Sequence, residues 1–422
     1  MALMNRAIKT FMALALSAGT LAAGQPAHAA SFKTAPGVSM DLWVTWPDES
    51  RWGDRDAMLP FPEWRRSVTM DRLEALKDRG IGMIRLPVDP SPFLSSSAAA
   101  LHGELLDQVG GAVRELAAAG FRVILDLHSI PAGPNRSIGT AQVLESETLF
   151  DAYLAFVRDA ARLVARMDPQ TVALEVMNEP VSGCTSPDER KDWEEKLKRL
   201  YAAARASALD TTLILSGACW GGAEGLAALD PGIIPDDNIM WSFHSYAPFI
   251  LTHQGAGWTG DVSPYATGIP FPPNGENATR TKAALDAIRA RVDAEAPFAR
   301  KSGIIAFVEE ELAKLDTPEK LAAEMEKPFA TVAEWASRHG VAPADIILGE
   351  FGMIRQEYGH DFVMKPHWRA AYVEAMASHA MRHGFAWSVW GYGGAFGVVE
   401  EFEGRPAEPD VLDALQRAAT PK

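Results

Sequence analysis

The chain has 422 residues, of which 47% are hydrophobic and 23% are charged. This is the composition of a soluble globular protein, and it excludes a chain that is disordered throughout. The formal net charge of −15 disfavours nucleic acid and anionic lipid as partners and suits a neutral or cationic ligand. After the first 29 residues, no apolar run reaches the ~18 residues that a membrane span requires.

Residues 1–29 have the features of a secretory signal peptide. Arg6 and Lys9 make a basic start, residues 11–21 are mostly apolar, and Ala27-His28-Ala29 supplies the small residues of a cleavage site. The alternative is a disordered tail. We therefore expect a secreted or periplasmic protein whose single domain is residues 30–422, with 38 Lys and Arg against 55 Asp and Glu.

Eight short apolar runs predict β-strands. In chain order they are Val38–Trp46, Gly82–Val88, Arg122–His128, Thr171–Asn178, Thr212–Gly217, Asn238–Tyr246, Asp345–Gly352 and Phe385–Trp390. Amphipathic helical stretches lie between them at Trp64–Arg79, Leu101–Ala119, Leu149–Met167, Pro187–Ala208 and His367–His383. Some of these helices end before Gly80, Gly120 or Gly384, which suits a left-handed helix cap. The alternation predicts an α/β fold, a single-domain (β/α)8 TIM barrel.

One connection is much longer than the roughly 30 residues of an average barrel unit. It predicts an insertion between strands six and seven, at about residues 250–340. Its first part, Gly255–Gly275, is rich in Gly and Pro and carries Trp258, and helical sequence follows. We expect a lid or rim over the barrel mouth, because long ordered loops are usually functional. The alternative is a helical decoration that never approaches a ligand.

In a barrel of this kind, the residues that perform chemistry lie at the C-terminal ends of the strands. The polar residues near the predicted ends are Arg85, His128, Asn178, Glu179, His244, Tyr246 and Glu350, and Trp390 ends the last strand. A single histidine at a strand end is more often structural than functional, so no member of this set decides the function alone. Packing alone does not explain why two carboxylates, two imidazoles, a guanidinium, an amide, a phenol and an indole surround one opening.

Strand alternation sorts the neighbours of these residues, because successive side chains point to opposite faces. Trp390 and Ser388 face one way and Trp387 faces the other, so Trp387 should pack under the outer helices if Trp390 faces the mouth. Glu175 shares the side of Glu179, one layer deeper. A buried carboxylate needs partners, so we expect Glu175 to support the site through hydrogen bonds rather than to react.

The two cysteines, Cys184 and Cys219, follow predicted strands four and five. Neighbouring strands bring these loops together, and an exported chain can be oxidised. We expect a disulfide between them, which requires Cα atoms within about 7 Å. Two cysteines alone cannot form a structural zinc site.

Strand ends that read RLPV, DLHS, VMNEP, FHSY and GEFG, with a late Trp, resemble glycoside hydrolase family 5, the cellulase-like retaining hydrolases. The resemblance runs over most of the chain, and Asn-Glu-Pro with Gly-Glu-Phe-Gly is its most specific part. It implies that Glu179 is the acid/base and Glu350 the nucleophile. The supporting roles it implies are hydrogen bonds to the nucleophile from Arg85 and Tyr246, a contact of Asn178 with the sugar 2-hydroxyl, lining of the site by His128 and His244, and a sugar platform at Trp390. The chain departs from the family in lacking a second histidine after His128 and in its long insertion.

The chemistry fits these residues independently of the resemblance. Hydrolysis with retention needs one carboxylate as nucleophile and one carboxyl group as acid, about 5 Å apart. Strands four and seven lie roughly opposite in an eight-stranded barrel, so Glu179 and Glu350 can face each other across the mouth. Arg85 and the Tyr246 hydroxyl favour an ionised nucleophile, and partial desolvation favours a protonated acid.

Sugar binding also needs aromatic platforms. Trp46, Trp220 and Trp258 follow strand-like runs and are candidates, although about half of such residues belong to the core instead. The expected partner is a β-linked polysaccharide or oligosaccharide, and the expected activity is endo-β-1,4-glucanase (cellulase). β-Mannanase, β-1,3-glucanase and β-glucosidase are the alternatives. We expect no cofactor, no metal and a monomer.

Two rival interpretations belong to other classes. A metal-dependent hydrolase would use Asp126, His128, Glu179 and His244 as ligands, and the residue types allow this. A carbohydrate-binding barrel without catalysis would need only one of Glu179 and Glu350, or neither. The presence of both therefore favours an enzyme.

Overall fold

The computed structural model describes residues 30–59, 68–184 and 186–420. Within these residues the strands are β1 (Gly37–Ser39), β2 (Met83–Val88), β3 (Arg122–Leu127), β4 (Val172–Glu175), β5 (Leu213–Ser216), β6 (Ile239–His244), β7 (Ile346–Glu350) and β8 (Ala386–Val389). Each strand pairs in parallel with the next, and β8 pairs with β1 to close a barrel. The predicted (β/α)8 barrel is confirmed. The expected signal peptide, residues 1–29, lies outside the described residues.

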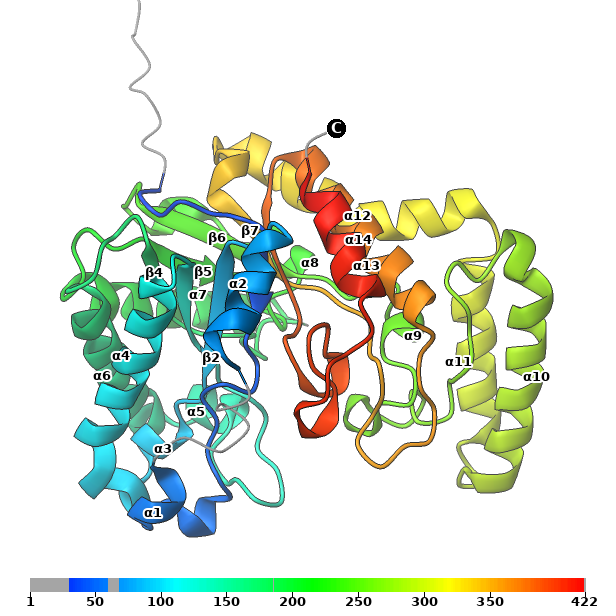
Figure 1. Cartoon of the computed structure of the whole chain (residues 1–422), viewed down its shortest axis with the longest axis horizontal. Helices are drawn as coiled ribbons and strands as arrows, with labels where there is room; N and C mark the ends of the chain where they lie inside the picture. The colour runs from blue at the N-terminus through cyan, green and yellow to red at the C-terminus, as the bar shows by residue number, and fades with distance from the viewer. Residues whose placement is uncertain (1–29, 60–67, 185, 421–422) are drawn as a thin grey trace, which may run out of the picture.

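Helices surround the barrel (Figure 1). They are α1 (Arg55–Met58), α2 (Met70–Asp78), α3 (Ser91–Leu94), α4 (His102–Ala118), α5 (Thr140–Glu145), α6 (Glu147–Val164), α7 (Pro187–Arg205), α8 (Ala223–Ala227), α9 (Phe249–Thr252), α10 (Ala278–Glu295), α11 (Lys301–Ala313), α12 (Pro318–His339), α13 (Pro366–His383) and α14 (Asp410–Ala419). Gly80, Gly120 and Gly384 have φ of +81°, +85° and +75° after α2, α4 and α13, as their sequence positions predict. None of the helices in the described part of the chain is long and apolar enough to cross a membrane.

The interior of the barrel consists of two layers that follow from strand alternation. The lower layer is apolar and consists of Met83, Ile124, Ala173, Ile214, Met240 and Ile347. Two positions further along five of these strands, and therefore on the same inner side, lie the buried polar residues Arg85, Asp126, Glu175, Ser216 and Ser242. The apolar layer fills the base of the barrel, and the polar layer forms the floor of its mouth.

Glu350 is an exception to this alternation. Counting from Ile347 inside the barrel, Gly349 would point inward and Glu350 outward. The register between β6 and β7 shifts at Phe243/His244, so that His244 pairs with Glu350. A Cβ on Gly349 would lie 2.5 Å from Ser242 Oγ, so only glycine fits there. This irregularity turns the Glu350 carboxylate into the mouth.

The first predicted strand is wrong in its length. Val38–Trp46 was expected to be extended, but β1 ends at Ser39 and a turn follows, in which the Trp43 amide donates to the Met40 carbonyl at 3.1 Å. Buried aromatic residues in this turn imitate the apolar pattern of a strand. The start of the helix expected at Trp64–Arg79 lies outside the described residues, and α2 begins at Met70.

The long connection between β6 and β7 has two parts. α12 packs against the barrel, with Phe329 and Trp335 in edge-to-face contact with Phe243 and Trp241 of β6. α10 and α11 instead form a hairpin that stands to one side of the barrel (Figure 1). Its own apolar residues, including Ile288 and Val308, are buried. α12 is therefore an ordinary barrel helix, and the additional sequence is the part before it.

Candidate active site

Arg85 of β2 is fully buried at the centre of the mouth and contacts three side chains of other strands and that of Asn178, which follows β4. Its guanidinium donates to Glu175 at 2.7 Å, to Glu350 at 2.7 Å and to Asn178 at 2.7 Å, and pairs with Asp126 at 2.9 Å. Burial opposes the charge, but Asp126, Glu175 and Glu350 together raise the pKa of Arg85 well above its usual value. Arg85 therefore remains a fixed cation that holds three carboxylates in place.

Both carboxylate oxygens of Glu350 are hydrogen-bonded. Oε1 accepts from Arg85 Nη1 at 2.7 Å, and Oε2 accepts from the Tyr246 hydroxyl at 2.9 Å. Burial and the neighbouring Glu350 raise the pKa of Tyr246 well above its usual value, so the phenol keeps its proton and remains a donor. These two donors stabilise a negative charge on Glu350.

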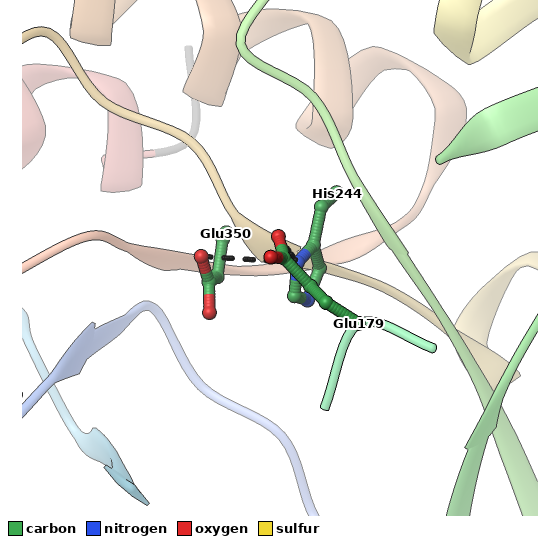
Figure 2. A group of neighbouring side chains, drawn as sticks. All are labelled: Glu179, His244 and Glu350. Atoms are coloured by element: carbon green, nitrogen blue, oxygen red, sulfur yellow. Dashed lines mark hydrogen bonds and ion pairs between the residues drawn. The ribbon is translucent and has the colours of Figure 1, made fainter. Parts of the chain in front are cut away.

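Glu179 has a different environment, although it faces Glu350. Its Oε1 lies 2.8 Å from His244 Nδ1 (Figure 2). Burial raises the pKa of Glu179 to about 7, whereas burial lowers the pKa of His244 to about 4. At neutral pH the imidazole is therefore neutral, and Glu179 can hold a proton. Ligand atoms of Glu179, His244 and Glu350 all lie within 4.8 Å of one another.

The backbone around Glu179 is in a conformation that L-residues seldom adopt. Glu179, Cys219 and Trp220 have φ of +37°, +54° and +60°. Such geometry costs roughly 1–3 kcal/mol per residue and persists only where the surroundings enforce it. Amide-to-carbonyl hydrogen bonds of 2.7 and 2.8 Å join the segments after β4 and β5, and Cys184 and Cys219 form a disulfide with Cα atoms 4.6 Å apart. This cross-linked pair of loops holds the Glu179 side chain over the mouth.

A second hydrogen-bonded chain fixes His128 and Asn178. His128 Nδ1 lies 2.6 Å from Asp126, and burial lowers the pKa of His128, so Nδ1 donates and Nε2 is free to accept. The Asn178 amide oxygen accepts a hydrogen bond from Arg85, and its NH2 group therefore points towards His128 Nε2 at 3.5 Å. The Trp390 indole stacks on the His128 ring, with centroids 5.1 Å apart. The orientation of each group therefore depends on Arg85 or Asp126.

A cavity of about 330 Å³ opens over Glu179 and Glu350. Six of the sequence-predicted site residues line it, namely His128, Glu179, Tyr246, Trp258, Glu350 and Trp390. Arg85, Asn178 and His244 are buried and are not among the residues that line it. Trp258, in the segment after α9, is 56% exposed and lines the cavity together with His253, whereas no residue of α10 or α11 does.

Two of the predicted aromatic platforms are differently placed. Trp46 is only 8% exposed, donates from Nε1 to the Asp89 carbonyl at 2.9 Å and packs edge-to-face on Phe93. Its prediction as a platform is wrong, because the turn after β1 buries the indole. Trp220 is 47% exposed but does not line the cavity over the two glutamates.

Asp41 is a cavity residue that sequence reasoning missed. Burial raises its pKa to about 7, backbone N–H groups of Gly393 and Tyr392 oppose the shift, and Glu350 adds to it. Leu42, His253, Tyr358 and Phe396 also line the cavity and were not predicted. The expected strand Val38–Trp46 concealed Asp41, because an acidic residue inside a predicted strand is not at a strand end.

The family described as Cellulase (glycosyl hydrolase family 5) matches residues 56–395. The chain belongs to glycosyl hydrolase family 5. It is 23% identical over 207 residues to Endoglucanase C of Acetivibrio thermocellus, which covers 49% of this chain and 58% of that protein. It is 28% identical over 202 residues to a probable glucan 1,3-beta-glucosidase A of Emericella nidulans, which covers 44% of this chain and 45% of that one. The chain therefore spans about half the length of these curated relatives.

The fold of this family 5 member is also found in solved structures. Thermotoga maritima Cel5A in complex with cellobiose superimposes with a TM-score of 0.63 at 18% identity, over 90% of this chain and 97% of that chain. The same protein has been solved with mannotriose, with a TM-score of 0.61. At this identity the similarity supports the barrel fold alone.

Replacing Cys184 and Cys219 together by serine should lower the free energy of unfolding by about 3–4 kcal/mol, because the cross-link restricts the unfolded chain. The two residues are 35 positions apart. Urea unfolding of the oxidised protein and of the double variant measures the difference. Reduced wild-type protein is the matched control and should behave like the variant. Equal midpoints for all three would contradict a stabilising disulfide.

Arg85→Met should lower the free energy of unfolding by about 3–5 kcal/mol, because it keeps most of the buried volume but leaves three carboxylates without their cation. Arg51→Met is the control, because the Arg51–Asp54 pair is exposed. It should leave stability nearly unchanged. Urea unfolding of the two variants is the measurement. A midpoint for Arg85→Met that equals that of wild type would show that Arg85 does not hold the mouth together.

Proposed function

We propose that this protein is a retaining endo-β-1,4-glucanase in which Glu350 is the nucleophile and Glu179 the acid/base. The observation that carries the proposal is the separation of the two side chains, whose nearest carboxylate oxygens lie within 4.8 Å. Retaining enzymes have carboxyl groups about 5–5.5 Å apart, whereas inverting enzymes need roughly 6.5–9.5 Å to admit a water molecule. The unequal environments of the two residues assign the roles.

In the first step, a Glu350 oxygen attacks the anomeric carbon and the bond to the leaving oxygen breaks. Glu179 gives its proton to that oxygen, and a covalent α-glycosyl ester forms on Glu350. His244 is neutral at neutral pH and hydrogen-bonds Glu179 Oε1, which leaves the other oxygen for the substrate. Because the imidazole is neutral, it places no positive charge beside Glu179 that would favour loss of its proton.

In the second step, Glu179 is ionised and removes a proton from water as the water attacks the same carbon. The ester bond to Glu350 breaks, and the product regains the β configuration. Arg85 and Tyr246 receive the released carboxylate with hydrogen bonds to each oxygen. They therefore favour departure of Glu350 as much as its attack.

The remaining residues of the cavity orient the sugar. We propose that the Asn178 NH2 group contacts the 2-hydroxyl of the sugar, since Arg85 already occupies its oxygen. The His128 ring lines the cavity, and Trp390 and Trp258 provide aromatic faces on the cavity wall. Trp220, exposed beyond the cavity, is available to a longer chain on the Glu179 side.

A β-1,4-glucan is the proposed substrate, because endoglucanases are among the relatives and the related structure binds cellobiose. β-1,3-Glucan and β-mannan are the alternatives that the other similarities favour. Hydrolysis of a panel of purified β-glycans would decide among them. We further propose that residues 1–29 direct export and that residues 30–422 act as one monomeric catalytic domain. An oxidising compartment suits the Cys184–Cys219 disulfide.

The metal-dependent alternative loses support from the donor chemistry of the site. Asp126, a ligand in that interpretation, already contacts Arg85 at 2.9 Å and His128 at 2.6 Å. Glu179, His244 and Glu350 are close enough to bind an ion, but Arg85 and Tyr246 already engage both oxygens of Glu350. A cation there would have to displace a fixed guanidinium. Loss of activity on treatment with a chelator would support the metal-dependent mechanism instead.

The second-order rate constant kcat/KM should fall as the pH rises through about 7, because Glu179 then loses the proton that it must donate. Glu179→Gln, assayed on the same 4-nitrophenyl glycoside as wild type, should react more slowly and lack this falling limb. Asp41→Asn is the control, because the pKa of Asp41 is also raised to about 7. It should keep the limb. A falling limb that persists in Glu179→Gln and disappears in Asp41→Asn would move the titration to Asp41.

Azide rescue tests the two roles through the stereochemistry of the products. In Glu350→Ala, azide should attack an activated β-glycoside from the side of the lost nucleophile and give the α-glycosyl azide. In Glu179→Ala, the covalent intermediate still forms from a good leaving group, and azide should intercept it to give the β-azide. Nuclear magnetic resonance of the products distinguishes the two. Exchanged products would reverse the roles, and inversion by the wild-type enzyme would refute the mechanism.

A further inference from the structure

Asp41 is an acidic group in the cavity that the proposed mechanism does not use. It follows β1 by two residues, and its Oδ1 accepts a hydrogen bond from the Gly393 amide at 3.0 Å. A Cβ on Gly391 would lie 2.7 Å from the Asp41 carboxyl carbon, so the carboxylate packs directly on the backbone after β8. A Cβ on Gly394 would lie 3.4 Å from Oδ2. The absence of a side chain at Gly391 thus makes room for this carboxylate.

The carboxylate has a partner on one side and the cavity on the other. Its side chain lines the same cavity as Glu350. No ion pair found among the described residues includes Asp41. The Asp41 side chain is only partly exposed, and its carboxylate can accept further hydrogen bonds from a ligand in the cavity. Hydroxyl groups of a bound sugar are donors of the right kind.

The position of Asp41 in the barrel indicates which part of the substrate it meets. β1 pairs with β8, whereas β4, which Glu179 follows by four residues, lies across the closed barrel. The leaving group departs on the side of the residue that protonates it. Asp41 therefore faces the sugar that is attacked and not the leaving group.

We propose that Asp41 is a substrate-binding residue whose carboxylate accepts a hydrogen bond from the 3- or 6-hydroxyl of the sugar that Glu350 attacks. This inference rests on the proposed function. The 2-hydroxyl belongs to Asn178 in that proposal, and O4 carries the preceding sugar in a β-1,4 chain, which leaves these two hydroxyls. The same carboxylate would repel a sugar acid, so Asp41 also selects neutral sugars against uronic acids.

The test compares 4-nitrophenyl β-cellobioside with its 3-deoxy and 6-deoxy forms, modified in the glucose that carries the nitrophenol. Asp41→Asn keeps an oxygen for the Gly393 amide, so it should fold even if Asp41→Ala does not. It should lower kcat/KM on the parent substrate about 10- to 100-fold, the loss expected for a charge-assisted hydrogen bond. With wild type, one of the two deoxy substrates should show a similar loss of kcat/KM relative to the parent substrate. With Asp41→Asn, that deoxy substrate should react nearly as fast as the parent, because the hydrogen bond is already missing.

The control variant is Asp48→Asn, which replaces an exposed aspartate in the same connection after β1 and should change neither rate nor coupling. If removal of the hydroxyl lowers kcat/KM by the same factor in wild type and in Asp41→Asn, the inference is overturned and the glycosidase proposal stands. Calorimetric binding of cellobiose separates the two proposals. If no aryl glycoside is hydrolysed but Asp41→Asn weakens cellobiose binding more than tenfold, the function fails and the binding role holds. Unchanged or undetectable cellobiose binding in that case would overturn both.

Discussion

A single buried guanidinium organises the mouth of this barrel. Arg85 lies where an apolar layer gives way to a polar one, and it contacts residues from β3, β4 and β7 together with Asn178. Three carboxylates could not be buried so close together without a cation among them. The guanidinium has the planar, multiple-donor geometry that this task needs, and lysine does not. The orientations of the three carboxylates and of the Asn178 amide follow from this centre.

The same constraint separates the two glutamates chemically. Glu350 lies beside the cation and a phenol, both of which donate to it, whereas Glu179 contacts a neutral imidazole outside that cluster. Two carboxyl groups of equal environment would compete for a proton. Here burial raises the pKa of Glu179, whereas Glu350 accepts hydrogen bonds from two donors. The constrained backbone at Glu179 and the adjacent disulfide hold Glu179 opposite Glu350.

Sequence reasoning identified the features that depend on local pattern. Trp387 packs on Phe351 in the outer core, Ser388 contacts Ser39 inside the barrel, and Glu175 supports Arg85, as alternation along the strands implies. It failed where tertiary contacts override alternation. Nothing local predicts the register shift that turns Glu350 inward, and buried aromatics in the turn after β1 read as strand, which concealed Asp41 and misplaced Trp46. The apolar run at Val38–Trp46 reflects residues that are buried in a turn, and an apolar pattern alone does not distinguish a buried turn from an extended strand.

The walls of the cavity follow a different rule from its floor. The floor is fixed by strand ends and could be anticipated, but the walls come from loops that recognise each other. Gly257, beside Trp258, donates its amide to Glu357 at 2.9 Å, so the loops after β6 and β7 form one wall, which continues to Tyr358. The insertion therefore contributes to the cavity through a few residues near its start, and the α10–α11 hairpin contributes no residue to the lining. The length of an inserted segment is for this reason a poor guide to its role, and substrate choice depends on short contacts between loops.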